Sequence, residues 1–333
     1  MNILLTGATG FLGYRILEVL VNNPKIKLII ANGRSLMPSR RVTHDKVKYF
    51  LGDLSKIDFV HSLPNDIDVV INTASLSSPW GNRELFYKSN VITQKNIINY
   101  SKLNNINKII YISSPSIYYN GSDRFLVNES ERLPAKFVNH YSTTKRDAEI
   151  LLEDSNLDYI IIRPRAIIGR GDTVIMPRLI NAHKEQKLKI IGSGNNLVDL
   201  TSVANVVYAV ELSIFAPSKA INQTYNITDG NPVSLWESVN TVFKGIGLQP
   251  IVNKVNFFTA YFVAYIMEFS TSFLFKEKEP ALTKYSVGVL SKNFTLDISK
   301  AKELLNYKPI ISTNESINEF VDWYNNKNKN EEN

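Results

Sequence analysis

A turn with three glycines near the N-terminus limits what this chain can fold into more than any other feature. Gly7, Gly10 and Gly13 are spaced three residues apart. Residues 2–5 before them are apolar and predict a short buried strand, and residues 14–22 after them have helical periodicity. Glycine permits the sharp turn, a close approach of the backbone to a pyrophosphate, and tight helix–strand packing. The helix N-terminus then offers N–H groups to phosphates, so the pattern predicts a dinucleotide-binding loop.

Short apolar strands then alternate with helices. Further strands are predicted at 27–31, 47–51, 69–73, 109–113 and 159–163, and helices at 84–104 and 141–154. Strands that are apolar throughout and are separated by helices are typical of a parallel sheet covered on both faces. The expected fold class is therefore α/β, with a Rossmann doubly wound parallel sheet.

The alternation loosens after Pro164, where helices are predicted at 175–186, 204–215 and 235–245. We expect the helix at 204–215 to return to the first domain. The resulting division gives a dinucleotide-binding Rossmann domain of 1–165 and 195–225, and a smaller mixed α/β substrate-binding domain of 166–194 and 226–325. The last residues, 326–333, are polar throughout and are predicted to form a disordered tail.

Composition excludes several classes of chemistry. The chain has no cysteine, which rules out disulfides, thiolate catalysis and cysteine-bound zinc, and its four histidines lack metal-ligand spacing, so no metal is expected. The net charge of +7 suits an anionic ligand but does not argue for nucleic acid. No basic region precedes the first apolar run, which breaks into glycine at once. We therefore interpret it as a strand rather than an export signal, and expect a cytoplasmic protein.

The segment after the second strand bears on which dinucleotide binds. NAD sites usually place an acid there to hold the ribose 2′-hydroxyl, but none occurs between Glu18 and Asp45. Arg34 stands where a guanidinium can grip a 2′-phosphate, which favours NADP(H), with NAD(H) as the alternative. Arg34 could also be an ordinary solvated loop residue. Asp53, after the third strand, either accepts a hydrogen bond from adenine or caps a helix.

A second pattern concerns proton transfer. Tyr141 and Lys145 are four residues apart in a predicted helix, which places them on one face. A phenol has an ordinary pKa near 10, and a neighbouring ammonium lowers it toward the working range. Such a pair alone is common on helix surfaces. Here Ser114, after the fifth strand, offers a hydroxyl to a substrate oxygen, and Asn90 sits inside a helix, where it is mildly unfavourable and could position Lys145 through water.

The order of these motifs resembles the extended short-chain dehydrogenase/reductase superfamily over nearly the whole chain. The resemblance rests on Thr6-Gly-x-x-Gly-Phe-Leu-Gly, Gly52-Asp-Leu, Ser89-Asn-Val, Ser113-Ser-x-x-Ile-Tyr, Tyr141-x-x-x-Lys and Arg163-Pro. It implies Tyr141 as acid/base, Lys145 as its partner, Ser114 as the carbonyl-binding hydroxyl and Asn90 as the fourth member, with Ser113 and Ser116 as alternatives to Ser114. The chain departs from many members at Tyr119, where they have glycine.

The motifs together define an expected cofactor site. The residues expected to contact the nicotinamide nucleotide are Gly7, Thr9, Gly10, Phe11, Leu12, Gly13, Arg34, Ser35, Asp53, Leu54, Thr73, Ala74, Ser75, Tyr141, Lys145, Pro164 and Ile167.

The stretch from Arg163 to Leu179 and the stretch from Gly192 to Val203 resemble one branch, the 3β-hydroxysteroid dehydrogenase type. Within it the chain is most similar to bacterial 2-alkyl-3-oxoalkanoate reductases, which implies a β-keto or β-hydroxy group on a lipid-like substrate, often beside a carboxylate. Trp80 is a candidate substrate contact. The candidates for gripping a carboxylate are Arg165, Arg170 and Arg178.

Residues 256–275 are rich in aromatic side chains that recur around a helix, with few polar positions. Glu268, the hydroxyl groups and the length argue against a membrane-spanning helix. Three interpretations stay open: the segment lines or covers an acyl pocket, it lies in a membrane interface as a peripheral contact, or it is a buried helix.

The favoured function is an NAD(P)-dependent oxidoreductase that interconverts a ketone and a secondary alcohol on a hydrophobic substrate. The alternatives are a sugar-nucleotide epimerase or dehydratase with tightly bound NAD(P), and a redox-sensing binding protein with a disabled site. A homodimer is expected, paired through the helices near 84–104 and 141–154.

Overall fold

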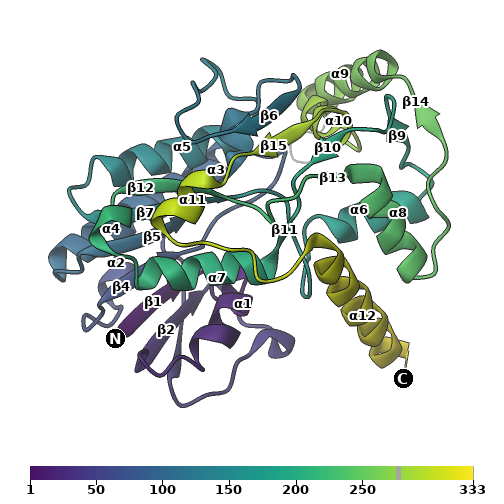
Figure 1. Ribbon diagram of the computed structural model, residues 1–333. Coiled ribbons are helices and arrows are strands. Elements are labelled where there is room, and N and C mark those ends of the chain that lie inside the picture. Colours follow the sequence, from purple (N-terminus) through teal and green to yellow (C-terminus); the bar gives the residue numbers. More distant parts are fainter. Residues whose placement is uncertain (275–278, 333) are drawn as a thin grey trace.

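The computed structural model describes residues 1–274 and 279–332, and it is built on a seven-stranded parallel sheet (Figure 1). The strand order is β12-β7-β5-β4-β1-β2-β3, and every neighbouring pair is parallel. The strands are β1 (Asn2–Thr6), β2 (Leu28–Gly33), β3 (Val47–Leu51), β4 (Val69–Asn72), β5 (Lys108–Ile112), β7 (Asp158–Pro164) and β12 (Gln223–Ile227). The order reverses between β1 and β4, as in a doubly wound Rossmann sheet, which confirms the predicted fold class.

Successive residues of each strand face opposite layers of helices. On β1, Ile3 and Leu5 pack toward α1 (Phe11–Leu20) and α7 (Val203–Ile214). Leu4 packs toward the other face, which is covered by α2 (Ile57–His61), α4 (Thr93–Leu103) and α5 (His140–Glu153). Both faces of the central strands are therefore buried, which is why those strands lack polar residues except near their ends, whereas the edge strand β3 is partly exposed.

The six strands predicted from the sequence are all present, and β12 is the strand that the sequence analysis missed. β12 lies at the edge of the sheet and begins with two polar residues, so it lacks the continuous apolar run of the central strands. The predicted helix at 84–104 is divided into α3 (Arg83–Phe86), a π-helical segment (Tyr87–Ile92) and α4.

The remaining elements form a smaller mixed α/β part. Its four-stranded sheet has the order β13-β10-β15-β6, and the pairs β8–β11 and β9–β14 stand beside it. The strands are β6 (Arg124–Val127), β8 (Ile167–Ile168), β9 (Ile190–Ile191), β10 (Leu197–Val198), β11 (Thr201–Ser202), β13 (Val233–Ser234), β14 (Lys254–Val255) and β15 (Phe294–Leu296). The helices are α6 (Met176–Lys184), α8 (Leu235–Gly245), α9 (Phe257–Leu274), α10 (Lys284–Ser291) and α12 (Thr313–Glu332). Helix α11 (Ser299–Leu304) packs instead against β12 of the seven-stranded sheet. β6 comes from residues that the sequence analysis assigned to the first domain.

Two expectations need correction. The backbone of 326–332 continues α12, whereas the sequence analysis predicted a disordered tail over 326–333. Each added residue of a helix gains one backbone hydrogen bond, and the lysine and glutamate in this stretch have favourable helix propensities. The buried-helix interpretation of 256–275 is also wrong for the described part, because α9 exposes most of its large apolar side chains. Within the described residues, no helix combines the length and apolar character needed to cross a bilayer.

A buried ion pair fastens α5 to the sheet. Both carboxylate oxygens of Glu149 accept hydrogen bonds from Arg163 on β7, from Nε at 2.8 Å and from one terminal nitrogen at 2.7 Å. Glu149 is 0% exposed and Arg163 4% exposed. The remaining terminal nitrogen of Arg163 donates to the hydroxyl of Tyr118, so its donors have partners. This pairing lowers the pKa of Glu149 even though burial raises it.

We expect Glu149→Gln to lower the free energy of unfolding by about 3–5 kcal/mol, because it leaves the Arg163 guanidinium buried without a counter-charge. The double variant Glu149→Gln/Arg163→Met should recover part of that loss, since it removes both charges. Urea unfolding measures both values. A single variant within about 1 kcal/mol of the native protein would show that the pair is solvated rather than buried.

Candidate functional site

The glycine turn lies at the point where the strand order reverses, between the ends of β1 and β4. Gly7 has a φ of +66°, and a Cβ atom there would lie 2.6 Å from Thr73 Oγ1. A Cβ on Gly13 would lie 2.1 Å from the Gly7 carbonyl oxygen, so the start of α1 can pack on the turn only because Gly13 has no side chain. In open α/β sheets this reversal point is where ligands bind.

Polar groups at the end of β4 hold the neighbouring loop. Thr6 donates to Asn72 through their side chains at 2.6 Å, and the Ala74 N–H donates to Asn72 Oδ1 at 3.1 Å. Thr73 Oγ1 donates to the Thr6 carbonyl at 2.6 Å. Ser75 Oγ is buried and has no hydrogen-bond partner within the described residues. The expected cofactor residues Thr73, Ala74 and Ser75 therefore border the glycine turn.

Charged residues gather where the adenosine end of a dinucleotide would lie. Arg34 follows β2 and is exposed, and its charge helps to lower the pKa of Asp53. Partial burial alone would raise that pKa, but hydrogen bonds from Ser55 and the charges of Lys88 and Arg34 outweigh it. Arg40 donates to the Thr9 carbonyl at 3.2 Å, which brings a second guanidinium to the glycine turn.

The Tyr141 phenol meets two serines that come from different strands. Ser114 follows β5, and Ser77 lies in the loop after β4. Both serine side chains act on the phenol to lower its pKa, but burial outweighs them and the net shift is upward. The sequence analysis expected the ammonium of Lys145 to lower this pKa. The structure differs because burial acts on both groups.

Lys145 is buried one helical turn further along α5. Its Nζ donates to the carbonyl of Ile112, the last residue of β5, at 2.7 Å. The same atom lies 4.8 Å from the centroid of the Tyr111 ring and 6.0 Å from that of Tyr141. Burial lowers the pKa of Lys145 to about 7, while the nearby carboxylate of Glu149 raises it. The amine is thus held at the sheet edge with its protonated form disfavoured.

Asn90 lies in the π-helical segment and is 2% exposed. Its Oδ1 accepts from the Leu76 N–H at 2.8 Å, and its Nδ2 donates to Thr144 Oγ1 at 2.9 Å. Asn90 therefore ties the loop after β4 to α5 at the residue before Lys145. A π-turn inside an α-helix is frequent at functional sites, because it displaces a side chain from the regular face.

Arg165 stands beside this group on the turn from β7 into β8. Ala166 has a φ of +43°, a conformation in which L-residues are uncommon and which is typical of strained turns at functional sites. The Arg165 guanidinium lies 4.7 Å from the Phe294 ring centroid, and its Nε is buried with no hydrogen-bond partner within the described residues. Burial lowers the pKa of Arg165, while Tyr285, Asp199 and Tyr119 oppose that shift.

Tyr285, on α10, connects Arg165 to the Tyr141 phenol. Its charge acts on the pKa of both Tyr141 and Arg165, and its ring packs edge-on against Tyr119 at 5.5 Å between centroids. Tyr119 occupies the position where many relatives of the expected superfamily have glycine. Its hydroxyl fits only because α10 has Gly288 there, where a Cβ atom would lie 1.5 Å away.

The other residues predicted to contact the substrate have different surroundings in the structure. Trp80 is partly buried in the loop after β4, where its carbonyl accepts from the Ser78 hydroxyl at 2.8 Å. Arg178 forms a two-bond ion pair with Glu279 at 3.0 and 3.2 Å, and Arg170 pairs with Glu18 at 2.6 Å. The guanidinium groups of Arg170 and Arg178 are therefore engaged by glutamates, whereas Arg165 has no carboxylate partner within ion-pair distance among the described residues.

Several expected cofactor contacts lie around the same turn. Phe11 and Leu12 begin α1 and are partly buried, and Phe11 lies against the loop that follows β8, because a Cβ on Gly171 would sit 3.6 Å from its ring. Pro164 ends β7, and Ile167 begins β8. Leu54 differs, because its side chain belongs to the core beneath the sheet. Gly10 and Ser35 are exposed beside the turn.

Sequence reasoning missed Ser77, Tyr285 and Arg40. Ser77 and Tyr285 belong to segments with no motif of their own, so only folding shows that they approach Tyr141. Arg40 was visible as half of an arginine pair, but its contact with Thr9 depends on a short 3₁₀ turn, Pro38–Arg40.

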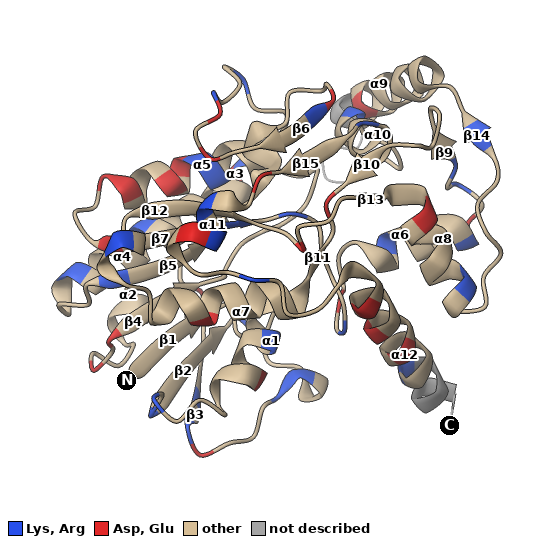
Figure 2. Cartoon of the chain, in the orientation of Figure 1, with Lys and Arg blue, Asp and Glu red and all other residues tan. Residues whose placement is uncertain are grey.

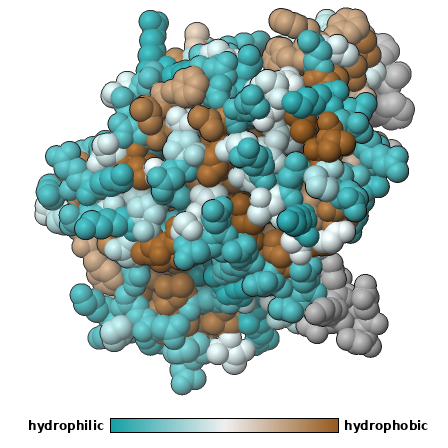
Figure 3. Space-filling model, turned by 45° about the vertical axis from the view of Figure 1, so that its right-hand side comes forward, coloured by the Kyte–Doolittle hydropathy of each residue, from teal (hydrophilic) through white to brown (hydrophobic). Residues whose placement is uncertain are grey.

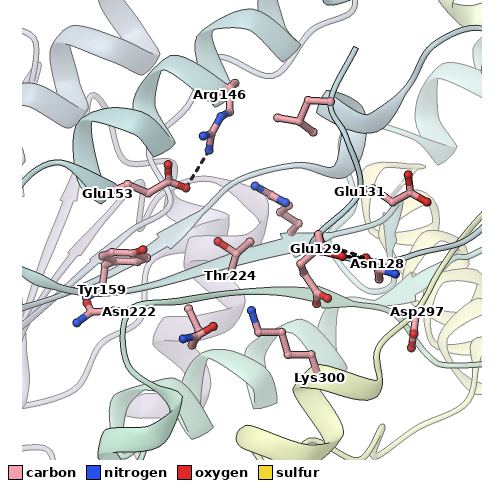
Figure 4. A pocket seen from close by; sticks show the side chains of 14 residues that line it. Asn128, Glu129, Glu131, Arg146, Glu153, Tyr159, Asn222, Thr224, Asp297 and Lys300 are labelled. Atoms are coloured by element: carbon pink, nitrogen blue, oxygen red, sulfur yellow. Dashed lines mark hydrogen bonds and ion pairs between the residues drawn. The ribbon is translucent and has the colours of Figure 1, made fainter. Parts of the chain in front are cut away.

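A cavity of about 580 Å³ lies elsewhere, between α5, the edge strand β12 and α11 (Figure 4). Charged residues line it, among them Glu129, Arg146 and Lys300, but Tyr141, Lys145 and Ser114 do not. Arg146 pairs with Glu153 across part of it at 2.8 Å. The cavity is a polar cleft beside the Glu149–Arg163 pair rather than part of the Tyr141 site.

The residues present fit a nicotinamide dinucleotide. The backbone turn at Gly7 and Gly13 has no room for side chains, which is what a pyrophosphate-binding turn requires. The buried Ser75 hydroxyl and the amine of Lys145 stand at the same sheet edge with capacity for further hydrogen bonds. Within the described residues, no group of three histidine, aspartate or glutamate side chains could hold a metal ion.

Comparison with known proteins agrees with this geometry. The sequence profile of the 3-beta hydroxysteroid dehydrogenase/isomerase family matches residues 4–255. A 2-alkyl-3-oxoalkanoate reductase of Shewanella oneidensis is 30% identical over 326 residues, covering 94% of this chain and 83% of that protein. A decarboxylating sterol-4-alpha-carboxylate 3-dehydrogenase of Candida albicans is 30% identical over 346 residues, covering 97% of each.

Among solved structures, the UDP-glucuronic acid 4-epimerase of Bacillus cereus in complex with NAD has a TM-score of 0.75. It is 21% identical and covers 98% of this chain and 99% of that one, which shows a shared fold. The matches in sequence extend over most of the chain, and the range matched by the family profile contains the glycine turn and the segment with Tyr141 and Lys145. The chain therefore belongs to the 3-beta hydroxysteroid dehydrogenase/isomerase family and is an oxidoreductase of the extended short-chain dehydrogenase/reductase type.

Proposed function

We propose that this protein uses NADP(H) to interconvert a ketone and a secondary alcohol on a hydrophobic β-keto or β-hydroxy substrate. The observation that carries the proposal is the meeting of the Tyr141 phenol, the Ser114 hydroxyl and the Lys145 amine at the sheet edge beside the glycine turn. The bound nicotinamide would supply or accept the hydride.

The proton chemistry belongs to Tyr141. Its raised pKa keeps the phenol protonated, so it can donate to the substrate oxygen when a ketone is reduced. Ser114 reaches the same phenol and supports charge that develops on that oxygen. In the oxidative direction a protonated Lys145 favours the phenolate, and its amine, anchored to Ile112, takes part in positioning the cofactor.

Arg165 is the residue that we assign to the substrate's carboxylate. Its guanidinium is nearly buried, and Tyr285 acts electrostatically on the pKa of both Arg165 and Tyr141. A buried guanidinium whose Nε–H has no acceptor is unfavourable unless an anion accepts that hydrogen bond. A carboxylate matches the planar geometry of the guanidinium. Trp80, in the loop beside Asn90, is placed to contact the apolar part of the substrate. These positions support a β-keto acid over a neutral ketone.

A panel of β-keto acids, carboxylated sterols and nucleotide sugars, followed by NADPH absorbance, tests the function. We expect net NADPH oxidation with a long-chain β-keto acid. Tyr141→Phe should lower kcat by at least about a hundredfold with unchanged NADPH binding, because the proton donor is lost. Turnover of nucleotide sugars without net NADPH oxidation would instead indicate an epimerase, and full activity of the phenylalanine variant would exclude the proposed mechanism.

The pH dependence of stability tests the burial of Lys145. Its folded pKa of about 7 lies below the ordinary 10.5, so between these pH values the unfolded chain holds a proton that the folded chain has released. The free energy of unfolding therefore rises with pH in this window, by at most about 1.4 kcal/mol per unit. Compared with Lys145→Met, the native protein should gain stability between pH 7 and 9.5 in urea unfolding. Parallel curves for the two proteins would contradict the burial of this amine.

Arg34 and Arg40 support a preference for the 2′-phosphate of NADP(H). Both guanidinium groups belong to the segment that follows β2, and no acid stands in that segment to hold a free 2′-hydroxyl. Asp53, partnered with Ser55 and near Lys88, is placed for the adenine amino group.

We expect NADPH to bind more tightly than NADH, and Arg34→Ala to weaken NADPH binding by about tenfold or more, the size of a lost charge-assisted interaction. NADH binding should change little. Arg41→Ala is a matched control, since it removes a neighbouring exposed arginine. Fluorescence titration of both nucleotides with the three proteins measures the six binding constants, and equal binding of NADH and NADPH by the native protein would remove Arg34 from this role.

A further inference from the structure

Helix α9 has two unlike faces. Ala260 and Ala264, which are 3% and 0% exposed, pack with Ile191 and Val287 in a small core beneath the helix. The opposite face consists of large apolar side chains: Phe258 is 77% exposed, Phe262 63%, Tyr265 53% and Phe269 66%, with Tyr261, Val263 and Ile266 beside them. Positions 258, 262, 265 and 269 follow one another at helical spacing, so they form a continuous stripe. We call these seven residues the outer face of α9.

The outer face is large for a protein surface. α9 stands at the periphery, and brown and tan atoms gather over it at the upper right of Figure 3. Single exposed apolar residues are ordinary, whereas a contiguous patch of this kind marks an interaction site. Phe258, Phe262 and Tyr265 are each more than half exposed among the described residues.

Charge is absent from the outer face and present around it (Figure 2). The one charged residue of α9, Glu268, turns toward α10, where it pairs with Lys284 Nζ at 3.1 Å and accepts from the Lys284 N–H at 2.7 Å. Lys284 lies 5.4 Å from the Tyr265 ring centroid, and Lys292 lies 4.6 Å from that of Phe257. Lys254, on β14 just before the helix, is exposed. Lys292 also pairs with Asp123 at 3.8 Å, whereas Lys254 donates only to the Ser193 carbonyl among the described residues. The aromatic stripe is thus bordered by three lysines, of which Lys254 keeps its charge without an ion pair among the described residues.

This combination matches an anionic lipid surface better than a protein. Phenylalanine and isoleucine enter the boundary of the acyl chains, tyrosines suit the headgroup level, and lysines attract anionic headgroups. The hydrogen-bonding groups of the seven residues are the hydroxyls of Tyr261 and Tyr265, and the other five side chains are wholly apolar. The net charge of +7 adds a general attraction to negative surfaces.

The position of α9 links this face to the Tyr141 site. α9 packs on α10, which carries Tyr285 beside Tyr119 and Arg165. Tyr261 of α9 also acts on the pKa of Tyr119. Tyr285 and Tyr119 therefore connect the packed pair of α9 and α10 to the surroundings of Arg165.

We propose that the outer face of α9 binds the surface of an anionic lipid bilayer, with the helix lying in the plane of the interface. The binding does not depend on which substrate is turned over. It places the wall formed by α10 and Tyr285 next to the bilayer, where an apolar substrate is concentrated.

Co-sedimentation with vesicles tests the proposal on the full chain. The vesicles contain phosphatidylcholine alone, or with about one third phosphatidylglycerol. We expect binding to the mixed vesicles, weakened by about tenfold or more in Phe258→Ser/Phe262→Ser because both side chains enter the lipid. Lys254→Glu should weaken binding to the anionic vesicles and leave binding to the neutral ones unchanged. Leu103→Ser and Ile310→Ser, which remove exposed apolar residues on other surfaces, should bind as the native protein does.

Two further measurements test whether the double variant is folded and whether α9 itself enters the lipid. Urea unfolding should show the double variant folded, since both of its side chains are exposed. Phe262→Trp should show a blue shift of its emission with mixed vesicles. Native protein that stays in the supernatant, or a double variant that binds equally well, overturns the proposal. Self-association that the double variant abolishes, without vesicle binding, overturns it too and makes this face an interface between two copies.

Discussion

A parallel sheet covered by helices on both faces leaves its carboxyl edge as the place where polar side chains from different strands meet. In this chain Thr6, Asn72, Ile112 and Pro164 end four neighbouring strands, and the loops that follow them carry the functional groups. The reversal of strand order between β1 and β4 opens space there, and the glycine turn keeps it free of side chains. The meeting of the serines, the phenol and the amine follows from this arrangement rather than from sequence neighbourhood.

Burying charged side chains is energetically unfavourable, and the structure offsets this in two ways. Glu149 and Arg163 compensate each other through two hydrogen bonds, so both stay charged inside the protein. Lys145, one turn away on the same helix, donates to the Ile112 carbonyl. The Glu149 carboxylate favours the protonated form of Lys145, but burial outweighs this effect and disfavours that form. The difference explains why one basic group is structural and the other can change its protonation near neutral pH.

In the smaller α/β part, α9 and α10 lie between the exposed outer face of α9 and the residues around Arg165. Small alanines let α9 approach the core, while Tyr119 and Gly288 fit each other at the side nearest to Arg165. The tyrosine in a position where many superfamily members have glycine is thus accommodated by a glycine on a different helix. Tyr285 stands between these groups and Tyr141, so a change on α10 would be felt at the phenol.

Much of the fold could be predicted because its signals are local. The glycine spacing and the apolar runs determined the sheet, six of its strands and the phosphate turn, and the spacing of four put Tyr141 and Lys145 on one helix face. The edge strand β12 and the surroundings of Ser77, Tyr285 and Arg40 were beyond local patterns. The different partners of Arg165, Arg170 and Arg178, the direction of the Tyr141 pKa and the outward aromatic face of α9 depend on the tertiary structure. Each of these depends on burial and on distances between segments far apart in the chain, and no local periodicity encodes those quantities.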